Sequence, residues 1–473
     1  MAFLIGGANT LDTGDFITNS LRFNDSDSAY LSITPSSAGN RRTFTYSGWI
    51  KTDVATASSK ALLSCGSDSG SNDYIMFQSG DKLRFSFGTE GNGDIITTGV
   101  FRDPFAWYHF VWAVDTTQGT AANRVKLYVN GTQSYAVTGT YPAQNYDTSF
   151  NNTEVQRIGA RAYSATQYYE GYMSDVYLID GQQLDASSFG ETNDNGVWIP
   201  KEYEGTYGTN GFRLEFKQTG TSANASGMGA DTSGNGNHLT PSNLTAQDVT
   251  TDTPMNNFCT GNPLIHMAGG NITPSYSEGN AQWHSGGNGS YGSSGHGNFA
   301  VTNGKWYWEL KIDAGRNNGV TAGIAPTSVF ENHYGTSTST DYTFARDDLG
   351  SYGYQFTNSG STKVTGTDAS NSTSYGTNWT EDDIIGVAMD LDNDTLTFYL
   401  NGASQGQAFS SLPDVYYTPA WYGYYNTVWG LNFGNAPFSI SSGNSDANGY
   451  GNFEYAVPSG YYALCTKNLA TYG

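Results

Sequence analysis

The aromatic run WYGYYN, which begins at Trp421, is the densest group of residues in the chain that could recognise a ligand. Aromatic faces stack on the CH groups of a sugar ring, and tyrosine is enriched where proteins meet their partners. The run therefore predicts a binding face made of Trp421, Tyr422, Tyr424 and Tyr425, joined by loop residues near Tyr334. Alternate aromatic residues in a strand also pack in cores, so the same spacing is compatible with Trp421 as a buried core residue.

A hydrolase acting on polysaccharides would need two carboxylates that flank the glycosidic bond. Glu309 and Asp313 lie four residues apart on an expected strand, but Glu309 falls on the polar side opposite the tryptophans, which predicts a solvated strand face. The six histidines form no HExxH motif, and the sequence contains neither a GxSxG elbow nor a phosphate loop. His109, inside an apolar strand, is predicted to be a hydrogen-bonded core residue. We therefore predict no catalytic residues and no enzyme.

One acidic turn copies part of a calcium loop. Asp390, Asp392 and Asp394 match its first three ligand positions, but the sixth position is Thr395 instead of Gly, and the twelfth is Asn401 instead of Glu. The segment also falls between two expected strands, whereas a calcium loop of this kind lies between helices. It is predicted to be a hairpin turn, and the sequence assigns no metal ligands.

The composition indicates that strands and turns position these residues. Only 14% of residues are charged, while the chain contains 59 Gly and 34 Tyr. Glycine and asparagine suit turns, and threonine and aromatic residues suit strands. Val125 to Val129 alternates apolar and polar residues and is followed by Asn130-Gly131, the strongest short-range hairpin signal. The chain is predicted to be all-β with antiparallel sheets.

Two stretches of the sequence echo each other. Trp112 to Gly131 and Val387 to Gly402 both read as a strand, an acidic turn, a second strand and Asn-Gly. The pattern recurs only once, and its two copies are separated by far more residues than one solenoid repeat contains. It predicts two domains of related architecture.

Longer motifs carry a family resemblance. FTYSGWIK, WYHFVWAVD, KLYVNG and GYMSDVYLIDGQQL, between residues 44 and 184, resemble the laminin-G-like, concanavalin-A-like jelly roll. GKWYWEL, GVAMDLDNDTLTFYLNG and YTPAWYGY, between residues 304 and 424, resemble the SPRY domain, in which loops at one end of the sandwich form the partner surface. Laminin-G-like domains often hold calcium at a sheet edge, so the resemblance leaves calcium open as a ligand at an unassigned site, and no other cofactor is expected.

The expected organisation is an N-terminal docking segment (1–20), a laminin-G-like jelly roll (21–195), a connector with few strands (196–297), a SPRY-like sandwich (298–440) and a C-terminal segment (441–473).

The phrases TPMNNFCTGNPL, from residue 253, and GYYALCTKNL, from residue 460, resemble sequences that flank such domains in structural proteins of marine and cyanobacterial phages. This resemblance implies a virion protein of the tail-fibre or receptor-binding type that recognises a host-surface glycan or protein. A capsid-decoration or head-fibre protein and a polysaccharide depolymerase remain open as alternatives. Other virion proteins are the expected partners, and a cyclic homo-oligomer, a trimer, is the expected assembly.

Charge and cysteine content restrict the partners further. The formal net charge of −22 and the lack of Lys/Arg clusters disfavour nucleic acid. Cys65, Cys259 and Cys465 have no metal-binding spacing and are predicted to be buried or incidental thiols. The start MAFLIGGANT lacks the basic region of a signal peptide, and no stretch approaches the ~18 apolar residues of a membrane span. We expect synthesis in a host cytoplasm, no membrane insertion and display in the virion.

Overall fold

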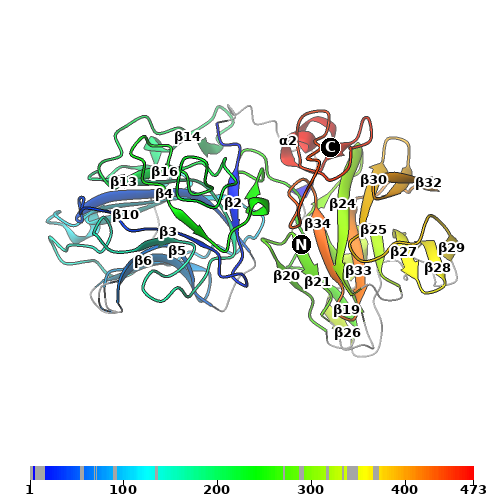
Figure 1. The fold of residues 1–473 in the computed structure, drawn as a ribbon, viewed down its shortest axis with the longest axis horizontal. Coiled ribbons are helices and arrows are strands. Elements are labelled where there is room, and N and C mark those ends of the chain that lie inside the picture. Colours follow the sequence, from blue (N-terminus) through cyan, green and yellow to red (C-terminus); the bar gives the residue numbers. More distant parts are fainter. Residues whose placement is uncertain are drawn as a thin grey trace. The chain divides into compact units, whose positions relative to one another are not determined.

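The computed structural model describes residues 4–5, 16–53, 58–68, 70, 72–88, 93–133, 137–269, 272–286, 292–315, 319–332, 335–337, 350–365 and 372–473. The chain forms two compact units, which we call the first sandwich (Thr13–Met255) and the second sandwich (Asn256–Gly473 with Met1–Asp12). Each consists of two mainly antiparallel sheets with a core between them, so the all-β prediction is confirmed (Figure 1). The described part of the chain contains two α-helices, both short, α1 (Thr327–Asn332) and α2 (Thr466–Tyr472). No helix among the described residues has the length and apolar character to cross a membrane.

The first sandwich pairs a seven-stranded sheet with an eight-stranded sheet. In Figure 1, β10, β4, β13 and β16 belong to one layer and β3, β5 and β6 to the other. The seven-stranded sheet contains, in order, β10 (Val125–Val129), β9 (Tyr108–Asp115), β4 (Thr43–Thr52), β13 (Gly171–Asp180), β2 (Ser20–Phe23) and β18 (Val249–Thr250), with β16 (Phe212–Leu214) paired to β13. The eight-stranded sheet contains β11 (Val137–Thr140), β8 (Asp94–Thr97), β7 (Lys82–Ser86), β6 (Asn72–Gln78), β5 (Lys60–Gly66), β12 (Gln156–Ile158), β3 (Tyr30–Ile33) and β17 (Thr240–Ser242).

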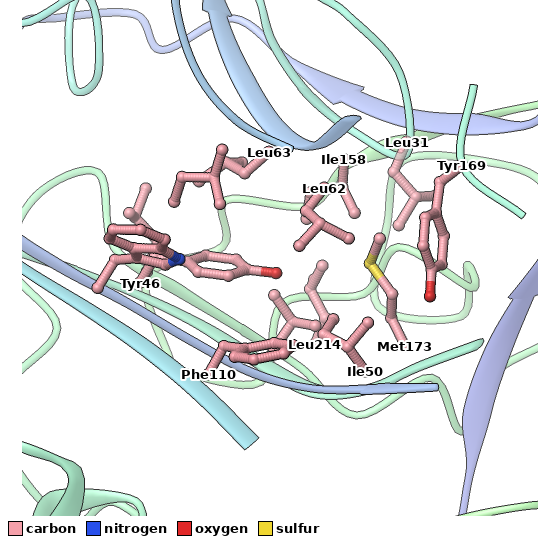
Figure 2. Packing of buried hydrophobic residues seen from close by; sticks show 14 of the residues in the cluster. Leu31, Tyr46, Ile50, Leu62, Leu63, Phe110, Ile158, Tyr169, Met173 and Leu214 are labelled. Atoms are coloured by element: carbon pink, nitrogen blue, oxygen red, sulfur yellow. The ribbon is translucent and has the colours of Figure 1, made fainter. Parts of the chain in front are cut away.

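Apolar residues from the two sheets meet face to face in the first sandwich. Figure 2 shows Leu62 and Ile158, from the eight-stranded sheet, opposite Ile50 and Met173, from the seven-stranded sheet. Successive residues of a strand point to opposite faces, so one side chain in two reaches this layer. Period-two alternation in the sequence therefore located the core strands.

The second sandwich also has two sheets with a core rich in tryptophan. One sheet contains β26 (Gly335–Ser337), β19 (Met267–Gly269), β22 (Gly292–His296), β33 (Tyr417–Tyr424), β25 (Thr321–Pro326), β27 (Tyr352–Thr357), β28 (Gly360–Thr365) and β29 (Ser372–Ser374). The other contains β20 (Ser275–Ser277), β21 (Gln282–His284), β34 (Val428–Asn432), β24 (Lys305–Ala314), β30 (Ile384–Asp390), β31 (Thr395–Leu400) and β32 (Ala403–Ser410), with β35 (Tyr462–Ala463) paired to β24. A short strand near the N-terminus, β1 (Leu4–Ile5), runs parallel to β23 (Phe299–Ala300).

The segment 196–297 differs from the expected connector. Its first part completes the first sandwich, because β16, β17 and β18 pair with β13, β3 and β2. Its second part completes the second sandwich through β19, β20, β21 and β22. The alternation of Phe212, Leu214 and Phe216 predicts β16, but the other strands have two to five residues and few alternating apolar positions, too short a pattern to stand out in a Gly- and Asn-rich stretch.

The two terminal segments also join the sandwiches where they are described. Within 1–20, Ile17 is buried in a cluster with Trp49 and Met255, and Ser20 begins β2. Within 441–473, Cys465 forms a bridge with Phe258 and the Cys259 N–H donates to Leu464 O at 2.9 Å. The two phrases that resemble phage sequences therefore pair with each other and close the second sandwich.

Candidate functional site

Trp421 is part of the core and not of the surface. It lies in the middle of β33, between β22 and β25, and its side chain has no solvent-exposed area. The ring packs edge-to-face against Trp283, with centroids 6.5 Å apart. The predicted role of Trp421 in a binding face is therefore wrong, because a side chain without exposed area cannot stack on a ligand.

Tyr422 points to the opposite face of the same strand, since neighbouring side chains alternate. It is only 3% exposed and packs with Val329 and Phe330 of α1 and with Met267 of β19. The short helix α1 therefore belongs to the apolar layer that buries this face. Tyr422 supports the strand and does not present its ring to solvent, so its predicted place in the binding face is also wrong.

The turn after β33 exposes the remaining aromatic residues. Tyr424 is partly exposed, and Tyr425 is 48% exposed, the largest value for a large apolar side chain in the described residues. Tyr425 and Asn426 both have left-handed backbones, with φ of +46° and +58°. A β-hairpin turn of this kind usually has Asn-Gly at these positions, because a tyrosine is strained there. The sequence places a large aromatic residue where a small one would be more stable.

Hydrogen bonds hold the base of this turn in place. Thr427 Oγ1 accepts from the Tyr424 N–H at 3.1 Å and donates to Gly315 O at 2.9 Å. The Thr427 N–H donates to Ser285 Oγ at 2.9 Å, and the Ser285 N–H donates to Thr427 O at 2.9 Å. A Cβ on Gly315 would lie 2.3 Å from Asn426 O, so only glycine permits this approach. Two other segments, at Ser285 and Gly315, thus fix the turn, while Tyr425 and Asn426 remain exposed.

A second exposed apolar pair lies at the other end of β33. Val415 is 38% exposed and Tyr416 is 41% exposed. Tyr416 and Tyr425 are nine residues apart in sequence, which corresponds to about 30 Å of strand, so these two tyrosines cannot contact one small ligand together. Tyr334, the remaining predicted site residue, lies outside the described residues.

Glu309 was expected on a solvated face, but it is buried without exposed area. Its carboxylate accepts hydrogen bonds from the N–H groups of Glu454 and Tyr455, both at 2.9 Å, from Asn432 Nδ2 at 3.0 Å and from Tyr307 Oη at 3.2 Å. Burial raises the pKa of Glu309 to about 7 against the opposing effect of these donors. The residue fastens the C-terminal segment onto β24.

Glu309 and Asp313 do not form a hydrolytic pair. Four residues of extended strand separate their Cα atoms by about 13 Å, whereas carboxyl pairs in most glycosidases are about 5–9.5 Å apart. Asp313 forms an ion pair with Lys311 at 3.1 Å. The Glu309 carboxylate is thus bound to neighbouring segments, and the Asp313 carboxylate is paired with Lys311 on its own strand.

The acidic turn at 390–394 joins β30 to β31 as a hairpin, as predicted. Asp390 forms an ion pair with Lys305 at 2.7 Å, and Asp392 accepts a hydrogen bond from the Gly304 N–H at 2.9 Å. These carboxylates fasten the turn to the start of β24. No group of three or more acidic, histidine or cysteine side chains among the described residues has the geometry to hold a metal ion.

His109 has the hydrogen bonds that the sequence analysis predicted. Trp198 Nε1 donates to His109 Nδ1 at 3.0 Å, which assigns the ring proton to Nε2, and Nε2 then donates to Ser47 Oγ at 2.9 Å. The ring stacks on Trp49 with centroids 4.8 Å apart. The three cysteines are free and buried, also as predicted.

The fold is therefore that of a two-domain β-sandwich protein. A known family model matches a part of each sandwich. Residues 25–187 match the concanavalin A-like lectin/glucanases superfamily, and residues 305–436 match the SPRY domain. The chain therefore carries a concanavalin A-like domain followed by a SPRY domain. Among curated protein sequences, none matches the chain.

Several solved structures align with parts of this chain at 16% sequence identity. The SPRY domain of human HERC1 aligns over 32% of this chain and 87% of its own, with a TM-score of 0.24. The PSpry domain of TRIM65 aligns over 37% of this chain and 91% of its own, with a TM-score of 0.27. A protein from Bacteroides ovatus that has been assigned to carbohydrate binding aligns over 50% of this chain and 60% of its own, with a TM-score of 0.34.

Proposed function

We propose that this chain is a non-enzymatic phage virion protein, of the tail-fibre or receptor-binding type, which attaches to a glycan or protein of the host surface. The observation that carries the proposal is the exposed Tyr425 in a strained turn of the SPRY domain. Non-glycine residues with left-handed backbones occur often where function requires a side chain at that place. The contact surface is the turn formed by Tyr424, Tyr425 and Asn426.

The chemistry of the turn suits a polar, ring-containing ligand. The face of Tyr425 supplies an apolar platform, and the amide of Asn426 can both donate and accept hydrogen bonds. The bonds from Thr427 and Ser285 pre-organise the turn, so little conformational entropy is lost when a ligand binds.

The virion assignment rests on the resemblance of the phrases at 253–264 and 460–469 to phage structural proteins. Their mutual pairing, through Phe258 and Cys465, supports reading them as the two borders of one module. We further propose that this module is displayed on the particle and that the chain assembles as a homotrimer. Sedimentation equilibrium measures the oligomeric state, and a monomer would contradict the proposed homotrimer.

Adsorption tests the proposal. Purified protein should compete with phage particles for host cells, and Tyr425→Ala should weaken this competition at least tenfold without changing the thermal unfolding midpoint. Tyr416→Ala, at a tyrosine that is also exposed at the other end of β33, is the matched control and should compete like the wild type. Equal competition by all three proteins would contradict the proposed surface.

Two further measurements distinguish a receptor-binding protein from a depolymerase and from a capsid-decoration protein. Incubation with host envelope polysaccharide should leave the length of its chains unchanged, and shortened chains would show a depolymerase instead. Antibody labelling of particles should place the protein at the tail. Labelling spread over the capsid would show a decoration protein.

A further inference from the structure

Arginine side chains gather on the outer face of the eight-stranded sheet of the first sandwich. Leu31 of β3 and Ile158 of β12 point into the core (Figure 2). Successive side chains of a strand alternate between its two faces, so Tyr30 and Arg157, their neighbours in sequence, point outward. Arg84 of β7 also points outward, because both of its neighbours in the strand belong to the core. This face therefore carries charge on its central strands.

Arg161, in the loop that follows β12, contacts two tyrosine rings. Its guanidinium carbon is 4.3 Å from the ring centre of Tyr74, in β6, and 5.1 Å from that of Tyr163. Nη1 donates to Gln167 Oε1 at 3.2 Å. With the Asn72 amide turned so that its oxygen faces the arginine, Oδ1 accepts from Nη2 at 2.8 Å and from Nε at 3.2 Å. All of these partners are neutral, so the charge of Arg161 is held in place without being compensated.

Arg157 lies directly beside Arg161. Its Nη1 donates to Arg161 O at 3.0 Å, and its guanidinium carbon is 4.8 Å from the ring centre of Tyr30. Tyr30 in turn stacks on Tyr168, with centroids 6.4 Å apart. Nε of Arg157 is buried without an acceptor, and Nη2 makes no hydrogen bond to the described residues. The guanidinium group of Arg157 therefore keeps N–H groups for a further partner.

The charge of these two arginines lacks a counter-ion. Neither Arg157 nor Arg161 forms an ion pair with the described residues, although the chain contains 43 acidic and only 21 basic residues. Arg84, on the same face, is paired with Asp94 at 2.8 Å. A partly buried charge without a counter-ion costs free energy, because it has lost part of its hydration. An anion supplied from outside would remove this cost.

The neighbouring tyrosine indicates what kind of anion fits. Tyr163 is 39% exposed, and the CH groups of a sugar ring stack on such aromatic faces. A guanidinium group binds a planar carboxylate through charge-assisted N–H···O bonds. Arg161 connects the two features, since its carbonyl accepts from Arg157 and its guanidinium group contacts the Tyr163 ring. A sugar that carries a carboxylate, a uronic acid, uses both.

We propose that this outer face binds a uronic acid unit of an acidic polysaccharide, with the carboxylate at Arg157 and the sugar ring on Tyr163. Arg161 is a positioning residue that contacts the Tyr163 ring and adds positive charge. The site belongs to the concanavalin A-like domain and does not depend on the turn at Tyr425. Adsorption through that turn and uronic acid binding are measured separately, so either can fail alone.

Calorimetric titration of the whole chain tests the chemistry of the ligand. The probe is the trimer of galacturonic acid, and its methyl ester and the trimer of galactose are the neutral controls. The acid should bind, and both neutral trimers should bind about tenfold more weakly or less, as expected when charge-assisted hydrogen bonds are lost. Equal binding of the acid and its methyl ester would overturn the proposal. Tighter binding of a sulfated galactose trimer than of the acid would overturn the assignment to a carboxylate.

Variants of the protein locate the site. Arg157→Gln removes the charge but keeps a side chain that can donate to Arg161 O, and it should weaken binding of the acid about tenfold or more. Tyr163→Ala should weaken binding several-fold without changing the thermal unfolding midpoint, because the ring is exposed. Arg102→Gln, at an exposed arginine in the loop before β9, is the matched control and should bind like the wild type. Wild-type affinity in either Arg157→Gln or Tyr163→Ala, or an equal loss in Arg102→Gln, would overturn the proposal.

Discussion

Asn401 in the second sandwich occupies the same structural position as Asn130 in the first. Asn130 has a φ of +46°, accepts a hydrogen bond from the His109 N–H at 2.8 Å and donates its own N–H to His109 O at 2.9 Å. Asn401 has a φ of +48° and makes the same two bonds with Ile384, both at 2.9 Å. Each asparagine closes a turn and fastens the end of one strand to the start of its neighbour.

The left-handed backbone and the side-chain bond of Asn401 can be separated by mutation. Asn401→Gly keeps the backbone and loses the side-chain bond, which should cost about 1 kcal/mol of unfolding free energy. Asn401→Ala also places a Cβ in the left-handed region and should cost a further 1–2 kcal/mol, approximately. Urea unfolding of the second sandwich measures both, with Asp414→Ala, an exposed residue, as the control. Equal costs for Gly and Ala would contradict the role of the backbone.

These turns show what the sequence determines locally. Asn-Gly after an alternating strand predicted both turns, and the echo of Trp112–Gly131 in Val387–Gly402 corresponds to the β9–β10 and β30–β31 hairpins. Turn chemistry and period-two alternation depend on neighbours in sequence, so both are readable without a structure. The fold class follows from the same two signals.

The surface could not be predicted in this way. Alternation shows that Trp421 and Glu309 point to particular faces of their strands, but not what covers those faces. Residues 454–455 of the C-terminal segment cover Glu309, and the other sheet covers Trp421. Both covering elements are distant in sequence, so local patterns carried no information about them. Tyr425 remained exposed because it lies in a turn, which the same patterns could identify.

Trp421 and Tyr425 should respond differently to truncation. Trp421→Ala leaves a cavity in the core and should cost about 3–5 kcal/mol of unfolding free energy. Tyr425→Ala removes an exposed ring and should change the unfolding free energy by less than about 0.5 kcal/mol. Thermal and urea unfolding measure both values. A large loss of stability in Tyr425→Ala would show that packing of this ring stabilises the fold, which would contradict the proposed contact surface.

Strain at Tyr425 should be relieved by glycine. Tyr425→Gly permits the left-handed backbone at no steric cost and should raise the unfolding free energy by up to ~1 kcal/mol. The same variant should lose the proposed binding, since the ring is gone. Tyr422→Gly, at a buried strand position, serves as the contrast and should be strongly destabilising. A destabilised Tyr425→Gly would mean that contacts of the ring outweigh the backbone strain.

Glu309 should hold the C-terminal segment in place. Glu309→Ala leaves the partly buried N–H groups of Glu454 and Tyr455 without their acceptors, which should cost about 2–5 kcal/mol. Because this segment would detach first, limited proteolysis should cut the variant between 441 and 460 before the rest of the second sandwich unfolds. The control is Asp414→Ala, which removes an exposed carboxylate from the same unit. Resistance to protease equal to that of the wild type would contradict this role.

Acid should destabilise the first sandwich through His109. Burial lowers the pKa of His109 to about 3, whereas the unfolded residue titrates near 6.5. Between these values the unfolded state binds a proton that the folded state cannot, so unfolding becomes easier as the pH falls. The contribution of His109 to stability is therefore complete above pH 6.5 and declines by about 1.4 kcal/mol per pH unit below it.

Buried carboxylates change the unfolding free energy with pH in the direction opposite to His109, so the effect of His109 has to be measured as a difference between variants. Burial raises the pKa of Asp73 and Asp175 to about 6, and their contribution is lost as the pH rises toward 6. The difference in unfolding free energy between the wild type and His109→Gln isolates the histidine, and it should shrink steadily from pH 6.5 to pH 4.5. Ser47→Ala removes the same hydrogen bond without removing a titrating group, so its difference from the wild type should stay nearly constant. A difference for His109→Gln that does not change with pH would show that the ring can be protonated in the folded protein, contrary to its two hydrogen bonds.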